Sequence, residues 1–138
     1  DATKDEIVSA SRTVCADEFI SEMENGYLTE VNERGSKLSG GQKQLISFAR
    51  TLLSDPRILV LDEATSSIDA RTERLLQQGL NELLKGRTSF IIAHRLSTIK
   101  NCDRIMYIDN KGITESGTHE ELMAKKGDYY KLYTAQHI

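Results

Sequence analysis

The spacing of hydrophobic residues divides the chain into long helical stretches and short apolar runs. Helical periodicity predicts a helix capped by Thr3, a second helix over 16–24, and long helices over 40–54 and 70–84. The runs 58–61 and 88–93 lack polar alternation, which is typical of strands buried on both faces of a parallel sheet. The remaining pattern predicts a short helix, a strand, a returning hairpin strand and two final helices, over 96–101, 104–108, 113–115, 119–125 and 128–136.

The order of these elements predicts the architecture. Strands and helices alternate after Pro56, which favours an α/β layer with parallel strands. Before Pro56 the pattern contains only helices and loops, including an irregular loop over 27–38 with Gly35 as its turn. We therefore expect a helical subdomain over residues 1–54, attached to part of an α/β core over residues 55–138.

Composition narrows the class of protein. The chain has 138 residues, 38% hydrophobic and 28% charged, which suits one globular domain. Its net charge of −3 gives no broad attraction to nucleic acid or to an anionic membrane. No apolar run approaches the ~20 residues that span a bilayer, and the polar start resembles no signal peptide. Cys15 and Cys102 are expected to be free thiols. Because the chain starts at Asp1 inside a helical pattern, we expect a piece of a longer polypeptide.

The start of the helix predicted over 40–54 suggests an anion site. Ser39 and Gln42 have the spacing of a capping box. Gly40 and Gly41 between them are poor helix formers, so local stability does not explain them. A first turn without side chains leaves backbone N–H groups open at the positive end of the helix dipole, where a phosphate can bind. An ordinary glycine-rich turn is the alternative interpretation.

Two predicted strands end in polar side chains. Asp62 and Glu63 follow the first strand, and His94 follows the second. Open α/β sheets bind ligands at the carboxyl ends of their parallel strands. An aspartate there can hold Mg²⁺, a glutamate can act as general base toward water, and a histidine can bond a phosphate. A helix cap and a structural histidine are the alternatives.

Five segments together resemble the ATP-binding cassette (ABC) ATPases. Leu38-Ser39-Gly40-Gly41-Gln42 is similar to their signature sequence, and Ile58–Glu63 resembles their Walker B strand with its catalytic glutamate. The other three are similar to the D-loop, the switch-histidine segment and the C-terminal region, over 66–69, 92–98 and 117–122. The flanking sequence looks most like the nucleotide-binding domains of ABC exporters.

The resemblance implies a partial P-loop NTPase (RecA-like) core and a role for each matched residue. Two nucleotide-binding domains, identical or different, would sandwich ATP at the cytoplasmic side of a membrane, beside transmembrane domains of the same transporter. In that sandwich the signature segment would bind ATP held by the partner domain, and Asp69 would make contacts across the dimer. Asp62 would serve Mg²⁺, Glu63 would polarise the hydrolytic water, and His94 would hold the γ-phosphate.

The chain also departs from the family pattern. Leu45 stands where many relatives have arginine, and Ser67-Ile68 replace the commoner Ala-Leu. The sequence contains no G-x-x-x-x-G-K-[ST] phosphate loop (Walker A). The nearest match, over 112–118, lacks the lysine and falls in the predicted hairpin. The resemblance is therefore to the C-terminal portion of such a domain, and we expect unpaired strand edges and no ATP hydrolysis by this portion alone.

Two alternatives to the exporter remain open at this point. One is a soluble ABC ATPase of DNA repair or translation, although the long insertions usual in those proteins are absent from this sequence. The other is a lobe that no longer binds nucleotide and only regulates a partner. Retention of both Glu63 and His94 argues against the regulatory lobe.

Overall fold

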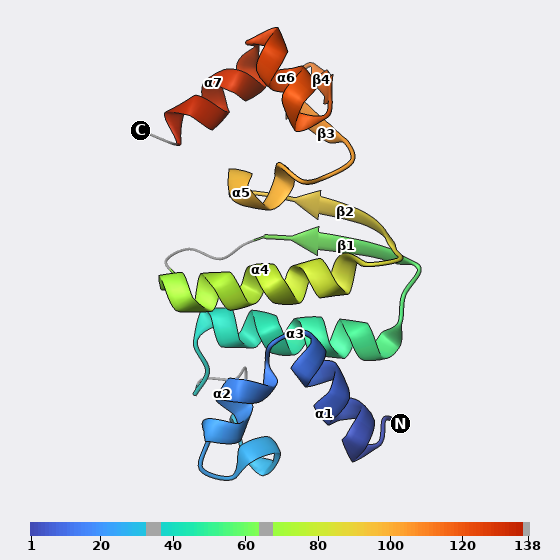
Figure 1. Ribbon diagram of the computed structural model, residues 1–138, viewed down its shortest axis with the longest axis vertical. Coiled ribbons are helices and arrows are strands. Elements are labelled where there is room, and N and C mark those ends of the chain that lie inside the picture. Colours follow the sequence, from blue (N-terminus) through green and yellow to red (C-terminus); the bar gives the residue numbers. More distant parts are fainter. Residues whose placement is uncertain (33–36, 64–67, 137–138) are drawn as a thin grey trace. The chain divides into compact units, whose positions relative to one another are not determined.

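The computed structural model describes residues 1–32, 37–63 and 68–136 (Figure 1). Their secondary-structure elements follow one another in the order α1 (Lys4–Thr13), α2 (Asp17–Glu22), η1 (a 3₁₀ helix, Gly26–Leu28), α3 (Gly40–Ser54), β1 (Ile58–Asp62), α4 (Ala70–Leu84), β2 (Thr88–Ile92), α5 (Leu96–Ile99), β3 (Ile105–Asp109), β4 (Gly112–Gly117), α6 (His119–Lys125) and α7 (Asp128–Ala135). Gly35, the predicted turn, lies outside the described residues.

Most helices begin where the sequence predicts, because local capping interactions fix their first residues. Thr3, Ser39 and Thr118 each close a capping box at the start of α1, α3 and α6. The prediction for α2 was too long, because the backbone turns to an extended ψ of 151° at Met23. The chain then enters η1, which the hydrophobic pattern did not predict.

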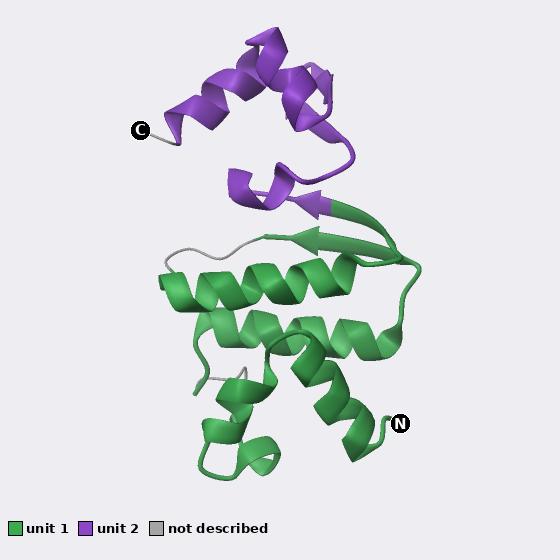
Figure 2. Ribbon diagram, viewed as in Figure 1, with its two compact units in different colours: residues 1–90 green, residues 91–138 purple. Residues whose placement is uncertain are grey.

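The chain divides into two compact units, residues 1–90 and 91–138, and the division falls within β2 (Figure 2). In unit 1, α1 and α4 both pack against α3. The buried side chains of this core come from the α1–α2 turn, from α2, from α3, from β1 and from α4: Val14, Ala16, Ile20, Leu45, Phe48, Ala49, Leu59, Leu76, Leu80 and Leu83. Because α3 and α4 share one core, the boundary between the two compact units does not coincide with the predicted subdomain boundary at residue 54. The division into those two subdomains stays a prediction.

Gly79, in the middle of α4, allows a close approach of another backbone segment within unit 1. A Cβ atom there would overlap the carbonyl oxygen of Val14 and lie 3.2 Å from its carbonyl carbon. Val14 is fully buried and precedes Cys15, which has a left-handed φ of 64°. The α1–α2 turn therefore rests directly on the backbone of α4, which explains a glycine in a helix interior.

Strands β1 and β2 pair in a two-stranded sheet and point in the same direction (Figure 1). The prediction that both strands are buried on both faces was wrong. Leu59 faces the helical core, whereas Ile58 and Val60 are 64% and 67% exposed, and Phe90 of β2 is 57% exposed. The reason is that the helical core of unit 1 covers one side of β1, so alternate apolar side chains remain open among the described residues.

Unit 2 contains an antiparallel hairpin and its covering helices. Strand β3 pairs with β4, with an irregularity between Tyr107 and Ile108. The sequence 112–118, rejected above as a phosphate loop, accordingly forms β4 and the start of α6. Four buried residues form the core of this unit: Leu96, Ile105, Leu122 and Tyr129. These elements and the parallel pair confirm the predicted α/β class, with a C-terminal hairpin and helices.

Candidate functional site

The tip of α3 has the geometry predicted for an anion-binding helix start. The Ser39 hydroxyl accepts the Gln42 N–H at 3.1 Å, and the Gln42 side chain accepts the Ser39 N–H at 3.1 Å. Gln42 therefore fixes the turn with its side chain. The first turn of α3 carries no acidic residue and includes Lys43, so its own side chains leave the positive end of the helix dipole uncompensated. Leu38, just before the cap, is half-buried.

The two glycines in this first turn occupy different environments. Gly40 is exposed, and a Cβ atom there would meet no atom of the described residues within 4 Å. Gly41 is buried, and a Cβ atom there would overlap the Cγ2 methyl of Thr72 and lie 3.6 Å from Cγ2 of Ile68. The prediction that both glycines keep the helix tip open therefore fits Gly40 only. Gly41 allows α4 to approach α3.

Asp69 is placed by its own chain at the start of α4. Its carboxylate accepts the Thr72 N–H at 2.9 Å and is the N-cap of that helix. Hydrogen bonds from the side chain and the backbone of Thr72 lower the pKa of Asp69 below its ordinary value. Asp69 is exposed, so the cap leaves its carboxylate accessible. Of the predicted D-loop, Ser66 and Ser67 lie outside the described residues.

Asp62 and Glu63 stand at the carboxyl end of β1, as predicted. Asp62 is the last residue of the strand and is exposed, whereas Glu63 is only 8% exposed. Both have interactions within the structure. In Figure 1 this end of β1 lies on the same side of unit 1 as the amino-terminal ends of α3 and α4. Unit 1 thus gathers the predicted phosphate, metal and base residues on one side.

His94 belongs to the second compact unit. It follows β2 and precedes the start of α5, and it is exposed. It also has an interaction within the structure. Glu63 and His94 thus belong to different units, and their joint action on one phosphate stays a prediction.

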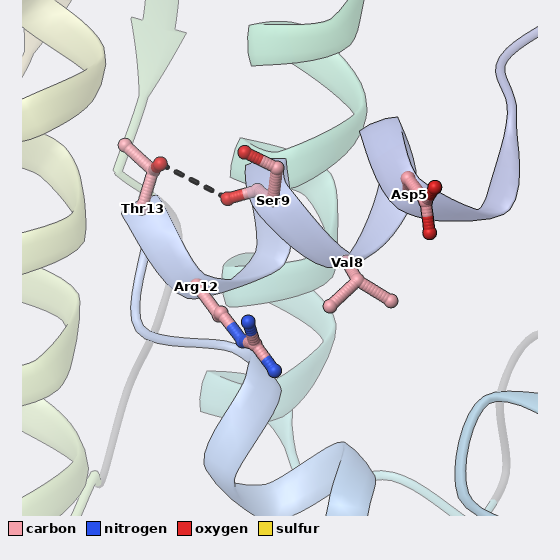
Figure 3. Close-up of a pocket in the computed structure, with 5 residues that line it drawn as sticks. All are labelled: Asp5, Val8, Ser9, Arg12 and Thr13. Atoms are coloured by element: carbon pink, nitrogen blue, oxygen red, sulfur yellow. Dashed lines mark hydrogen bonds between the residues drawn. The ribbon is translucent and has the colours of Figure 1, made fainter.

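Three further observations bound the site. Among the described residues, no group of three or more His, Cys, Asp or Glu side chains is arranged to hold a metal ion. Cys15 and Cys102 are free thiols, as predicted. A surface hollow runs along α1 and is lined by Asp5, Val8, Ser9, Arg12 and Thr13, none of them a predicted site residue (Figure 3).

Thr72 was absent from the predicted site, because a threonine in the first turn of a helix carries no recognisable signal of the contact it makes.

Comparison with known proteins supports the resemblance of the sequence motifs. Residues 3–66 match the ABC transporter family. The fold is similar to a bacterial Atm1-family ABC exporter solved with ATP bound, with a TM-score of 0.85 and 41% identity over 98% of this chain and 24% of that one. Over residues 3–66 the chain therefore resembles the ABC transporter family, and its fold is that of an exporter nucleotide-binding domain.

Two curated relatives illustrate the match. The uncharacterized ABC transporter ATP-binding protein YknV of Bacillus subtilis (strain 168) is 57% identical over 136 residues, which cover 99% of this chain and 22% of the relative. A putative multidrug export ATP-binding/permease protein of Staphylococcus aureus (strain NCTC 8325 / PS 47) is 52% identical over 137 residues, 99% of this chain and 24% of the relative. The chain thus spans about a quarter of the length of these relatives.

Proposed function

We propose that this chain is the C-terminal part of the nucleotide-binding domain of an ABC exporter, which hydrolyses ATP to drive transport. The observation that carries the proposal is the tip of α3, where a closed capping box orders the turn and the space around Gly40 stays open. Ser39, Gly40 and Gly41 would offer their hydroxyl and N–H groups to the γ-phosphate of ATP bound by a partner domain. Leu38 and Gln42 would hold the signature segment in shape.

The remaining site residues would act on the nucleotide from the strand ends. Buried Glu63 would accept a proton from the water that attacks the γ-phosphorus, while the bond to the bridging oxygen of ADP breaks. His94 would bond the γ-phosphate, and Asp69 would contact the partner across the dimer. The carboxylate of Asp69 is accessible for that contact even while it caps α4.

Mg²⁺ fits the donor set of this proposal. The carboxylate of Asp62 is a hard oxygen ligand, exposed at the end of β1. Mg²⁺ commonly binds one or two carboxylates together with water and substrate phosphates, so it does not need a cluster of protein ligands. Asp62 would therefore hold the ion, which supplies charge to the transferring phosphoryl group.

The proposed partners follow from the family. A second nucleotide-binding domain, identical or different, would complete the ATP site, and transmembrane domains of the same transporter would couple it to export. No described helix is long and apolar enough to cross a membrane. The proposal places the domain at the cytoplasmic face of the membrane. The names of the two relatives, which describe an ABC transporter ATP-binding protein and a putative multidrug export protein, favour this exporter over a soluble ABC ATPase or a regulatory lobe.

Replacement of the proposed base tests the assignment in the full-length protein. Glu63→Gln should preserve ATP-driven pairing of the nucleotide-binding domains, measured by crosslinking or light scattering, and should lower ATP turnover by about 10²-fold or more. Glu82→Gln is the matched control, because Glu82 forms a surface ion pair with Lys85 on α4. An undiminished ATPase rate in Glu63→Gln would remove Glu63 from the role of base. Absence of ATP-driven pairing in both variants would refute the ATP sandwich.

A further inference from the structure

Thr72 is the residue that joins the tip of α3 to the start of α4. Its Cγ2 methyl fills the space where a Cβ atom of residue 41 would stand, and its own Cβ lies 3.7 Å from that point. The space is closed on another side by Cγ2 of Ile68 at 3.6 Å. A side chain at residue 41 would therefore point into the contact with α4. It would leave the outward N–H groups of the helix tip uncovered.

The backbone of Thr72 is bound to Asp69. The Asp69 carboxylate accepts the Thr72 N–H at 2.9 Å, and Thr72 is the main cause of the lowered pKa of Asp69. Thr72 therefore contacts Gly41 through its methyl group while its own N–H is held by Asp69.

We infer that Thr72 is a positioning residue of the proposed ATP site, which locks the signature turn at Gly41 to the cross-dimer residue Asp69. This inference rests on the proposed function and deepens it. Both Gly41 and Asp69 would face the partner domain, so their spacing within one chain sets whether they engage the partner's nucleotide together. Residue 41 is then a glycine because the Thr72 methyl occupies the space that a side chain would need. Residue 40 is a glycine because the space outside the helix tip has to stay open.

A compensating pair of substitutions in the full-length protein tests the lock. Gly41→Ala should collide with the Thr72 methyl, lower the Tm and reduce the ATPase rate by roughly tenfold to a hundredfold, since displacements of ~1 Å at a site have effects of that size. Gly41→Ala combined with Thr72→Ser removes the colliding methyl and leaves ordinary contact with the Thr72 Cβ position, 3.7 Å away. We expect this double variant to regain most of the Tm and of the ATPase rate.

Two further variants separate positioning from folding. Gly40→Ala combined with Thr72→Ser is the matched control and should show no rescue relative to Gly40→Ala, because a Cβ at Gly40 meets no described atom within 4 Å. Thr72→Val keeps a methyl against Gly41 and removes the Thr72 hydroxyl, which helps to lower the pKa of Asp69. It should stay folded by circular dichroism and raise the ATP concentration needed for half-maximal turnover, an effect that a packing role alone would not produce.

The outcomes distinguish this inference from the proposed function. Recovery of both Tm and rate in the Gly41→Ala, Thr72→Ser double variant supports the lock. Recovery of the Tm without the rate overturns it and leaves Gly41 acting at the phosphate alone, with the proposed function intact. No recovery of the Tm overturns the packing premise. A wild-type protein without ATP turnover and without ATP-driven pairing would instead refute the proposed function.

Discussion

For the substitution Gly79→Ala, helix propensity and tertiary structure predict opposite changes in the free energy of unfolding. In an isolated helix interior, alanine is favoured over glycine by about 0.8–1.0 kcal/mol. In this fold the new methyl would overlap the Val14 carbonyl oxygen and stand 3.2 Å and 3.4 Å from the carbonyl carbon and the Cα of Val14. These are backbone atoms of the fully buried Val14, so no side-chain rotation can relieve the contact.

The magnitude follows from the balance of these two effects. Overpacking a rigid site costs about 1–3 kcal/mol, and a backbone neighbour puts this site near the upper end. After subtraction of the propensity gain, Gly79→Ala should lower the free energy of unfolding by about 2 kcal/mol. For a chain of this size that corresponds to a fall in Tm of roughly 5–10 °C.

Urea unfolding followed by circular dichroism, with hydrogen exchange of the α1 and α4 amides, measures the effect. Asn81→Ala is the matched control, because Asn81 is exposed on the same helix and its replacement should raise stability by about 0.5 kcal/mol. The reasoning is refuted if Gly79→Ala is as stable as the wild type or more stable, since the turn at Val14 would then yield without cost.

Two further predictions concern nucleotide and pH. The 138-residue chain alone, whose sequence holds no G-x-x-x-x-G-K-[ST] loop, should show no micromolar binding of Mg-ATP by calorimetric titration, and micromolar binding would contradict the proposed division of the ATP site between chains. The pKa of Asp69 is lowered in the folded chain, so its cap stabilises α4 above the unfolded pKa of about 3.9, and that stability is lost as the pH falls through the lower folded value. Asp69→Asn should therefore lose less stability than the wild type between about pH 6 and pH 3 in urea unfolding, and an equal loss would assign the acid sensitivity to other carboxylates.

Helix ends were predictable because their causes are local. Ser39 and Gln42 bond within one turn of backbone, and Pro56 cannot continue a helix, so the sequence around each position contains the whole interaction. The strand-end positions of Asp62 and His94 were predictable for a similar reason, because each follows a short apolar run.

The burial of the strands was not predictable in this way. The run 58–61 is apolar at every position, yet Leu59 is buried while Ile58 and Val60 are open. An apolar run indicates only that both faces of the strand can be buried. Which face is covered depends on how α3 and α4 pack together, and the residues of the strand itself do not specify that packing.

The sequence by itself determined where most helices begin, the α/β class, and which groups we propose to meet a phosphate, because capping, periodicity and motif spacing depend on neighbours along the chain. Only the tertiary structure decided that Gly40 faces open space while Gly41 and Gly79 are filled by Thr72 and Val14. The sequence alone does not distinguish these three glycines. The reason for each one depends on whether an atom approaches its Cα, and at Gly41 and Gly79 that atom comes from a segment far away along the chain.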